Sequence, residues 1–113
     1  MHIESYSFGR IVINGTTYTS DVIIYPGRVD PSWWREEGHR LGHADVADAL
    51  KARPDVLIIG TGYSGVMRVP QDALETIAAQ GVDVRVERTS QAVELYNELQ
   101  AGRKVVAALH LTC

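Results

Sequence analysis

The chain of 113 residues carries 11 lysines and arginines against 14 aspartates and glutamates, which gives a net charge of −3 and an isoelectric point near 5.7. This length predicts a single domain, residues 1–113, that buries roughly two thirds of its unfolded surface without disulfides or metals. The acidic balance and the absence of a basic tract exclude nucleic acid as an expected partner.

The location expected from the sequence is a reducing cytoplasm. The longest apolar runs, at 56–59 and 105–109, are too short to cross a bilayer, so we predict a soluble chain without membrane insertion. Met1–Ser5 lacks the basic start and the apolar stretch of a signal peptide. The only cysteine, Cys113, can form no internal disulfide.

Residues 1–25 are predicted to form a β-hairpin region. In the stretch GRIVINGTTYTSDVIIYP, β-rich residues flank Asn14-Gly15, a dipeptide that accepts positive φ at both central positions of a type I′ turn. The hairpin must bury its own apolar side, most simply by extending or covering the main sheet.

Residues 26–43 are predicted to be an irregular segment. The stretch PGRVDPSWWREEGHRLG has two prolines, three glycines and no sustained period. A connector of this length inside a compact domain is usually functional or is packed by its own large side chains. We expect one of Trp33 and Trp34 to anchor the segment to the core and the other to be available as a partner contact.

Residues 44–113 alternate between helical and strand patterns. A helix is expected from about Ala44 to Arg53. Later helices have the sequences QDALETIAAQ, with Leu74, Ile77 and Ala78 inward, and QAVELYNELQ, capped by Thr89 or Ser90. The strands DVLIIG, VDVRVE and KVVAALHL lie between and after them. Strands separated by single helices normally run parallel, and the alternating pattern of the second strand places it at or near an edge of the sheet.

The sequence GTGYSG at 60–65 matches the dinucleotide-binding pattern G-x-G-x-x-G, and Glu87 lies where a ribose-binding acid would be. However, Pro70 delays the next helix to about residue 70, whereas a dinucleotide site needs that helix beside the glycines. We therefore predict no nicotinamide or flavin cofactor. The glycines are interpreted as a sharp turn after a buried strand, or as a backbone N–H concavity for a small anion or carboxylate.

Other candidate chemistry in the sequence is weaker. His39 and His43 have the spacing of helical zinc ligands, but the neighbouring glycines argue against a rigid helix, so no metal is predicted. Ser64 lacks the second glycine of a nucleophile elbow. Asn97 and Arg103 are placed either to bind an anion or to bond turn carbonyls.

The chain resembles a small, largely uncharacterised domain family, an Mth-type domain of unknown function. The residues that carry the resemblance are Pro26, WW at 33–34, Arg35, GH at 38–39, VLIIGTG at 56–62, Thr89 with Ala92, YN at 96–97 and GRKVVAALHLT at 102–112. The family includes a mitochondrial complex I assembly factor and an adipogenesis-associated protein. The resemblance implies an α/β fold in three layers, with a central mostly parallel or mixed sheet flanked by helices and an N-terminal β-hairpin layer. It supplies no reaction and no catalytic residues, and it points towards assembly or partner binding.

Two classes of function remain open at this point. The favoured one is a non-catalytic binding or assembly module, and the alternative is a small-molecule-binding protein or enzyme that uses the same cleft beside the glycines. Converging side chains of Arg35, His39, Tyr63 and Arg103 would favour the alternative, and an apolar patch around a tryptophan would favour the module. A protein partner, a small anionic ligand and a homo-oligomer are all compatible with the sequence. The residues expected at this cleft are Trp33, Trp34, Arg35, His39, Gly60, Thr61, Gly62, Tyr63, Thr89, Asn97 and Arg103, joined by His110 if the last strand runs parallel to its neighbours.

Overall fold

The computed structural model describes residues 1–113 and contains two β-sheets and four helices. None of the helices has the length and apolar character needed to cross a bilayer. A small antiparallel sheet consists of β1 (Ile3–Ser7), β2 (Arg10–Ile13) and β3 (Thr16–Tyr18). The main sheet has the order β5-β4-β8-β6-β7, with β4 (Val22–Tyr25), β5 (Arg28–Asp30), β6 (Val56–Thr61), β7 (Asp83–Glu87) and β8 (Val105–His110). The helices are the 3₁₀ helix η1 (His43–Val46), α1 (Ala47–Lys51), α2 (Gln71–Ala78) and α3 (Thr89–Leu99).

The main sheet is mixed, because its two halves run in different directions. Strand β6 is parallel to both β7 and β8, whereas β4 is antiparallel to β8 and to β5. The β6–β8 register pairs Thr61 with His110, so both strands end at the same edge of the sheet. Strand β7 is the edge strand that its alternating sequence predicts.

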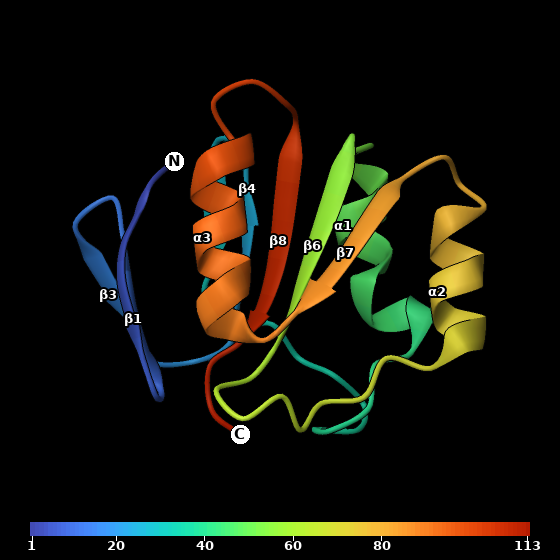
Figure 1. Cartoon of the computed structure of the whole chain (residues 1–113), viewed down its shortest axis with the longest axis horizontal. Helices are drawn as coiled ribbons and strands as arrows, with labels where there is room; N and C mark the ends of the chain where they lie inside the picture. Colours follow the sequence, from blue (N-terminus) through green and yellow to red (C-terminus); the bar gives the residue numbers. More distant parts are fainter.

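Three layers follow from the alternation of side chains along the central strands. Val56 and Ile58 of β6 belong to the core beneath α3 and the small sheet, whereas Leu57 and Ile59 belong to the core beneath η1, α1 and α2. Figure 1 shows α3 and α1 on opposite faces of the main sheet, with the small sheet beyond α3. The predicted α/β class, its central sheet and its N-terminal β layer are confirmed.

The hairpin predicted at Asn14-Gly15 joins β2 to β3, with φ angles of 48° and 81° at these two residues. The segment predicted as irregular over 26–43 contains one strand, β5, because its first residues return antiparallel beside β4. Helix α2 buries Ile77, as expected, and Leu74 is half-buried. Ala78 was wrongly expected to face inward: it is exposed, and Ala73 is buried instead.

Tyr96 on α3 provides a test of the core beneath that helix. Its side chain is 1% exposed, and burial raises the pKa of its hydroxyl to about 12. The pKa of this phenol is near 10 in the unfolded chain and about 12 in the folded chain. Its neutral form is therefore the one that the fold favours, so its contribution to stability is fully present below pH 10 and is lost as the pH rises through 12. Relative to Tyr96→Phe, the wild type should lose about 1.4 kcal/mol of unfolding free energy between pH 8 and pH 11, measured by urea denaturation. An equal loss in both proteins would contradict this account.

Candidate functional site

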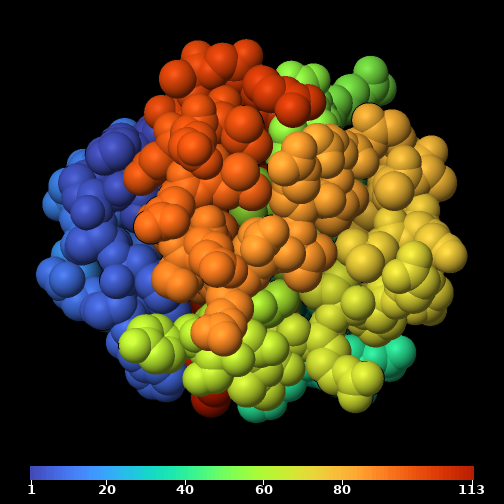
Figure 2. Space-filling model, viewed as in Figure 1, coloured from blue at the N-terminus to red at the C-terminus, as the bar shows by residue number.

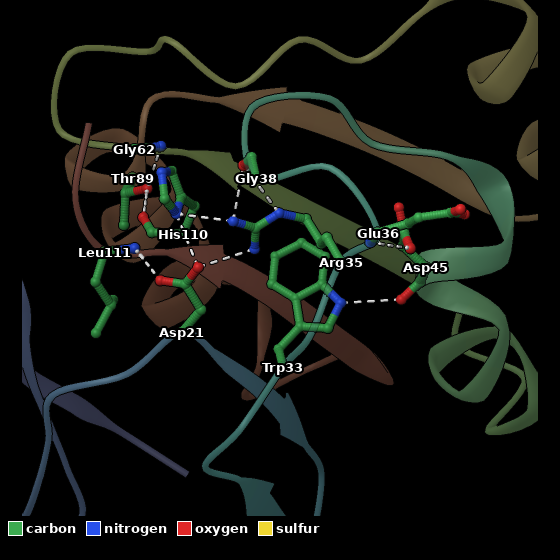
Figure 3. Close-up of polar contacts among 10 residues, drawn as sticks. All are labelled: Asp21, Trp33, Arg35, Glu36, Gly38, Asp45, Gly62, Thr89, His110 and Leu111. Atoms are coloured by element: carbon green, nitrogen blue, oxygen red, sulfur yellow. Dashed lines mark hydrogen bonds and ion pairs between the residues drawn. The ribbon is translucent and has the colours of Figure 1, made fainter.

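A buried polar cluster lies at the edge where β6 and β8 end. It consists of Asp21, just before β4, Arg35 in the irregular segment, and His110, the last residue of β8 (Figure 3). Asp21 Oδ2 lies 2.8 Å from Nδ1 of His110 and 2.9 Å from Nη1 of Arg35, whose side chain is 5% exposed. The carboxylate thus joins three segments that are far apart in the sequence.

The contacts of His110 decide where its proton lies. An ionised carboxylate can only accept, so the 2.8 Å contact assigns the proton to Nδ1, which donates to Asp21. Arg35 Nη2 lies 3.1 Å from the same Nδ1, but it donates to the carbonyl of Gly38 at 2.9 Å. In the neutral imidazole Nε2 is then an acceptor, and it is buried with no hydrogen-bond partner.

The ionised form of Asp21 is strongly favoured. Burial alone would raise its pKa, but hydrogen bonds from His110, from the Leu111 amide and from Arg35 together hold that pKa below its ordinary value. The Leu111 amide donates to Oδ1 at 2.8 Å, so both carboxylate oxygens are occupied. The cluster therefore pairs one carboxylate with one guanidinium inside the fold.

The neighbours of Arg35 hold it in place. Its Nε and Nη2 both donate to the Gly38 carbonyl, at 3.2 and 2.9 Å, which closes the chain into a short loop. Its guanidinium carbon lies 4.6 Å from the ring centre of Trp33, a cation–π contact. The indole Nε1 of Trp33 in turn donates to the carbonyl of Asp45 at 2.9 Å. The irregular segment is thus fixed by its own large side chains.

The GTG loop, residues 60–65, has almost no free backbone donors. The Gly62 amide donates to Thr89 Oγ1 at 2.8 Å, and the Gly65 amide donates to the Gly62 carbonyl at 3.3 Å. The amides of Tyr63 and Val66 donate to the carbonyls of Thr112 and Cys113, at 2.7 and 3.0 Å. An N–H concavity for an anion, as the sequence suggested, is therefore not present in this loop. The hydroxyl of Thr89 also donates to the His110 carbonyl at 2.6 Å, so Thr89 ties the loop to β8 and does not cap α3.

The glycines of the loop are required by close packing. A Cβ on Gly60 would lie 2.8 Å from side-chain atoms of Leu109 and Thr89, and one on Gly62 would lie 2.6 Å from the backbone of residues 112 and 113. The next helix, α2, begins only at Gln71. In a dinucleotide-binding fold, the glycines of this pattern lie at a helix N-terminus. Here they lie where the loop packs closely against the C-terminal residues of the chain.

The structure divides the residues expected at the cleft. Those brought together at the ends of β6 and β8 are Trp33, Arg35, His39, Gly60, Thr61, Gly62 and Thr89, with the rings of His39 and His110 6.0 Å apart. Asn97 instead clamps β1, since its side-chain amide exchanges two hydrogen bonds with the backbone of Ile3. Arg103 lies 3.8 Å from Asp83 at the start of β7, which is the other end of the sheet. Convergence of Arg35, His39, Tyr63 and Arg103 would have favoured a ligand pocket, and Arg103 lies away from the other three.

The hollows near this region are open and polar. One, of about 480 Å³, is lined by Arg40, Arg68, Val69, Pro70 and Gln71. Another, of about 330 Å³, lies between residues 36–45 and the start of α2. No three His, Cys, Asp or Glu side chains are grouped as metal ligands would be.

Exposed aromatic side chains mark the surface around the closed cluster. Phe8 and Tyr63 are 56% and 55% exposed, and their ring centres lie 6.0 Å apart. Figure 2 shows the yellow-green surface of the GTG loop next to the blue surface of the N-terminal strands. Trp33 is 7% exposed and Trp34 is 75% exposed, so the tryptophan pair divides into an anchor and a surface residue as expected.

Comparison with known proteins places the chain in a family. The family model described as a protein of unknown function (DUF498/DUF598) matches residues 3–110. The chain belongs to this family. A DUF498/DUF598 relative from Xenopus tropicalis, NADH dehydrogenase [ubiquinone] 1 alpha subcomplex assembly factor 3, is 30% identical over 114 residues, covering 96% of this chain and 59% of the relative. This chain therefore spans little more than half of that relative.

Solved structures show the same DUF498/DUF598 fold. The conserved hypothetical protein PH1505 from Pyrococcus horikoshii OT3 matches with a TM-score of 0.85 and 27% identity over the whole of both chains. A protein from Bordetella parapertussis matches with a TM-score of 0.82 and 29% identity, covering 97% of this chain and 94% of its own. The family resemblance carried by the sequence motifs is confirmed.

Proposed function

We propose that this domain is a non-catalytic protein-binding module that acts in the manner of an assembly factor. The observation that carries the proposal is the exposure of Trp34, 75%, directly beside the buried anchor Trp33. An exposed tryptophan on a segment fixed by its neighbours offers a large contact area with little conformational entropy to lose on binding. Tyr63 and Phe8 add a second exposed aromatic surface on the GTG loop and the N-terminal sheet.

The closed polar cluster supports a binding role over a catalytic one. An Asp–His pair can act as a general base only when a substrate reaches the free imidazole nitrogen. Here Nε2 of His110 is buried, and Arg35 is held against the same imidazole by Gly38. These polar side chains bond to one another, so they stabilise the segment that carries Trp34.

The relative from Xenopus tropicalis supports the same reading, since its name describes an assembly factor. An assembly factor binds other proteins, and such binding uses exposed aromatic anchors on a rigid frame. The name of that relative does not identify the partner of this chain, because the match covers only 59% of the relative.

Site-specific photo-crosslinking tests the proposal. A photoreactive phenylalanine analogue is introduced at Trp34, at Tyr63 and at Gln91, an exposed polar residue of α3 that serves as the control position. Irradiation in the cell should give one discrete protein adduct at position 34 or 63 and none at 91. The partner identified by mass spectrometry is then purified and titrated against the domain, and Trp34→Ala or Tyr63→Ala should weaken binding by about 10-fold or more.

The alternative class, a small-molecule carrier or enzyme, would use the unpartnered Nε2 of His110. It requires residues 35–39 to move away from the imidazole, because Arg35 and the ring of His39 now flank it. The absence of an adduct at all three positions, or the same adducts at all three, would overturn the protein-binding proposal in favour of this class.

A further inference from the structure

A hollow beside Trp34 has the composition of a docking surface. Its volume is about 410 Å³, and half of its ten lining residues are hydrophobic, among them Ile23, Ala44 and Ala47. The indole of Trp34 lies at this hollow and is 75% exposed. We call this surface the tryptophan hollow.

The charge of the tryptophan hollow has one sign. Asp30, Glu36, Asp45 and Asp48 line it, and none of its lining residues is lysine, arginine or histidine. Asp30, Glu36 and Asp45 have no ion-pair partner, and Asp48 has only a 3.6 Å contact with Lys51 between side chains that are both 80% exposed. Contacts of this exposed kind are weak and exchange readily for a better partner.

The frame around the hollow is fixed. Asp45 accepts the amides of Gly42 and Glu36 at 2.8 and 3.3 Å, and its carbonyl accepts the indole of Trp33 (Figure 3). The arginines near the hollow already have partners. Arg28 is stacked 3.9 Å from the ring centre of Tyr25, and Arg35 lies 4.6 Å from the ring centre of Trp33 and is paired with Asp21 at 2.9 Å. Glu36, which has no ion pair, and Asp48, which has only the exposed contact with Lys51, thus line the same hollow as the exposed indole of Trp34.

We infer that the tryptophan hollow binds an arginine-bearing basic segment of the partner protein. This inference rests on the proposed protein-binding function and adds the chemistry of the partner. A guanidinium stacks on an indole face while its N–H groups reach carboxylates in a planar fork, so one arginine side chain satisfies both features of the hollow. The apolar floor accepts the methylene stem of that arginine.

A peptide titration followed by NMR tests the inference with the whole chain. The probe is the synthetic peptide acetyl-Gly-Arg-Arg-Gly-amide, and the readout is the indole N–H signal of Trp34. The indole N–H of Trp33, which is bonded to the Asp45 carbonyl, provides an internal reference. We expect saturable shifts at Trp34 with a dissociation constant on the order of 1 mM, weakening as salt is added.

Matched variants separate a specific hollow from general charge attraction. The double variant Glu36→Gln/Asp48→Asn should weaken peptide binding by about fivefold to tenfold. In Trp34→Ala, where the backbone amide signals of Ala47 and Asp48 replace the indole as the readout, binding should be abolished. The control Glu94→Gln/Glu98→Gln removes two exposed carboxylates from α3 and should leave binding unchanged.

Equal weakening by the two double variants would overturn the inference, as would equal binding of acetyl-Gly-Glu-Glu-Gly-amide or no shift at Trp34. The two proposals fail separately. If a specific partner is crosslinked but the peptide gives no shift at Trp34, only the inference of a basic segment is refuted. If no partner is crosslinked, the proposed protein-binding function itself is refuted.

Discussion

Asp21→Asn is expected to lower the free energy of unfolding by about 3–5 kcal/mol, because it leaves the buried guanidinium of Arg35 without its counter-charge. The side chain of Arg35 is 5% exposed and that of Asp21 is 17% exposed, so water cannot replace the lost partner. The substitution also weakens the acceptor of the His110 Nδ1–H. Urea denaturation at pH 7 measures the effect.

Asp83→Asn is the matched control for this substitution. Asp83 also has arginine partners, Arg85 at 3.0 Å and Arg103 at 3.8 Å, but all three side chains are at least 38% exposed. Exposed pairs of this kind contribute about 1 kcal/mol or less. If both asparagine variants lose the same amount of stability, burial of the Asp21 pair is not what holds this edge of the sheet.

The double variant Asp21→Asn/Arg35→Met keeps the prediction testable even if Asp21→Asn does not fold. It removes both charges, so it should be more stable than Asp21→Asn alone.

The pH dependence of stability gives a further check on the same ion pair. Since the pKa of Asp21 is depressed in the fold, its contribution is present above its unfolded pKa, near 3.8, and is lost as the pH falls through the lower folded value. The gap between wild type and Asp21→Asn should therefore be constant near neutrality and narrow below about pH 4.

The α/β architecture could be predicted from local patterns. The continuous apolar strands 56–61 and 105–110 are buried on both faces, and the alternating strand 83–87 lies at the edge. The direction of the last strand could not be derived from its sequence, because an apolar run has the same pattern whether its neighbours run parallel or antiparallel. The buried face of α2 was predicted only in part, with Ile77 right and Ala78 wrong, since an eight-residue helix has only two turns from which to derive that face.

The candidate site was predicted only in part, for a reason that lies in the folding of the chain. Trp33, Arg35 and His39 were expected beside the GTG loop. Arg35 and His39 flank His110, and Trp33 packs on Arg35. Thr89 links this group to the loop, since it bonds both the His110 carbonyl and the Gly62 amide. Asp21 was missed, although it holds the cluster together, because an aspartate before a strand looks like any other turn residue. Its role arises from the antiparallel pairing of β4 with β8, which brings residue 21 to residues 110 and 111. A contact across about 90 positions leaves no periodic trace in the sequence.

The final prediction concerns the middle glycine of the GTG loop. Gly62 has φ +105°, and a Cβ there would lie 2.6 Å from backbone atoms of Thr112 and Cys113. Gly62→Ala should therefore lower the unfolding free energy by about 2–5 kcal/mol, the sum of backbone strain and forced displacement of the neighbouring chain. The displacement also breaks the bonds from the amides of Tyr63 and Val66 to those two carbonyls.

Gly81→Ala is the control that separates the steric contact at Gly62 from the strain of a positive φ angle. Gly81 has φ +83°, but no atom lies within 4 Å of its added Cβ, so only the backbone strain of about 1–2 kcal/mol should appear. A larger loss at Gly62 than at Gly81, measured by urea denaturation, would show that the glycine is needed for the close chain crossing. Equal losses would mean that residues 112 and 113 move away from the added methyl group at little cost. The loop would then again have to be considered as a ligand loop, in which the glycine makes room for a bound group.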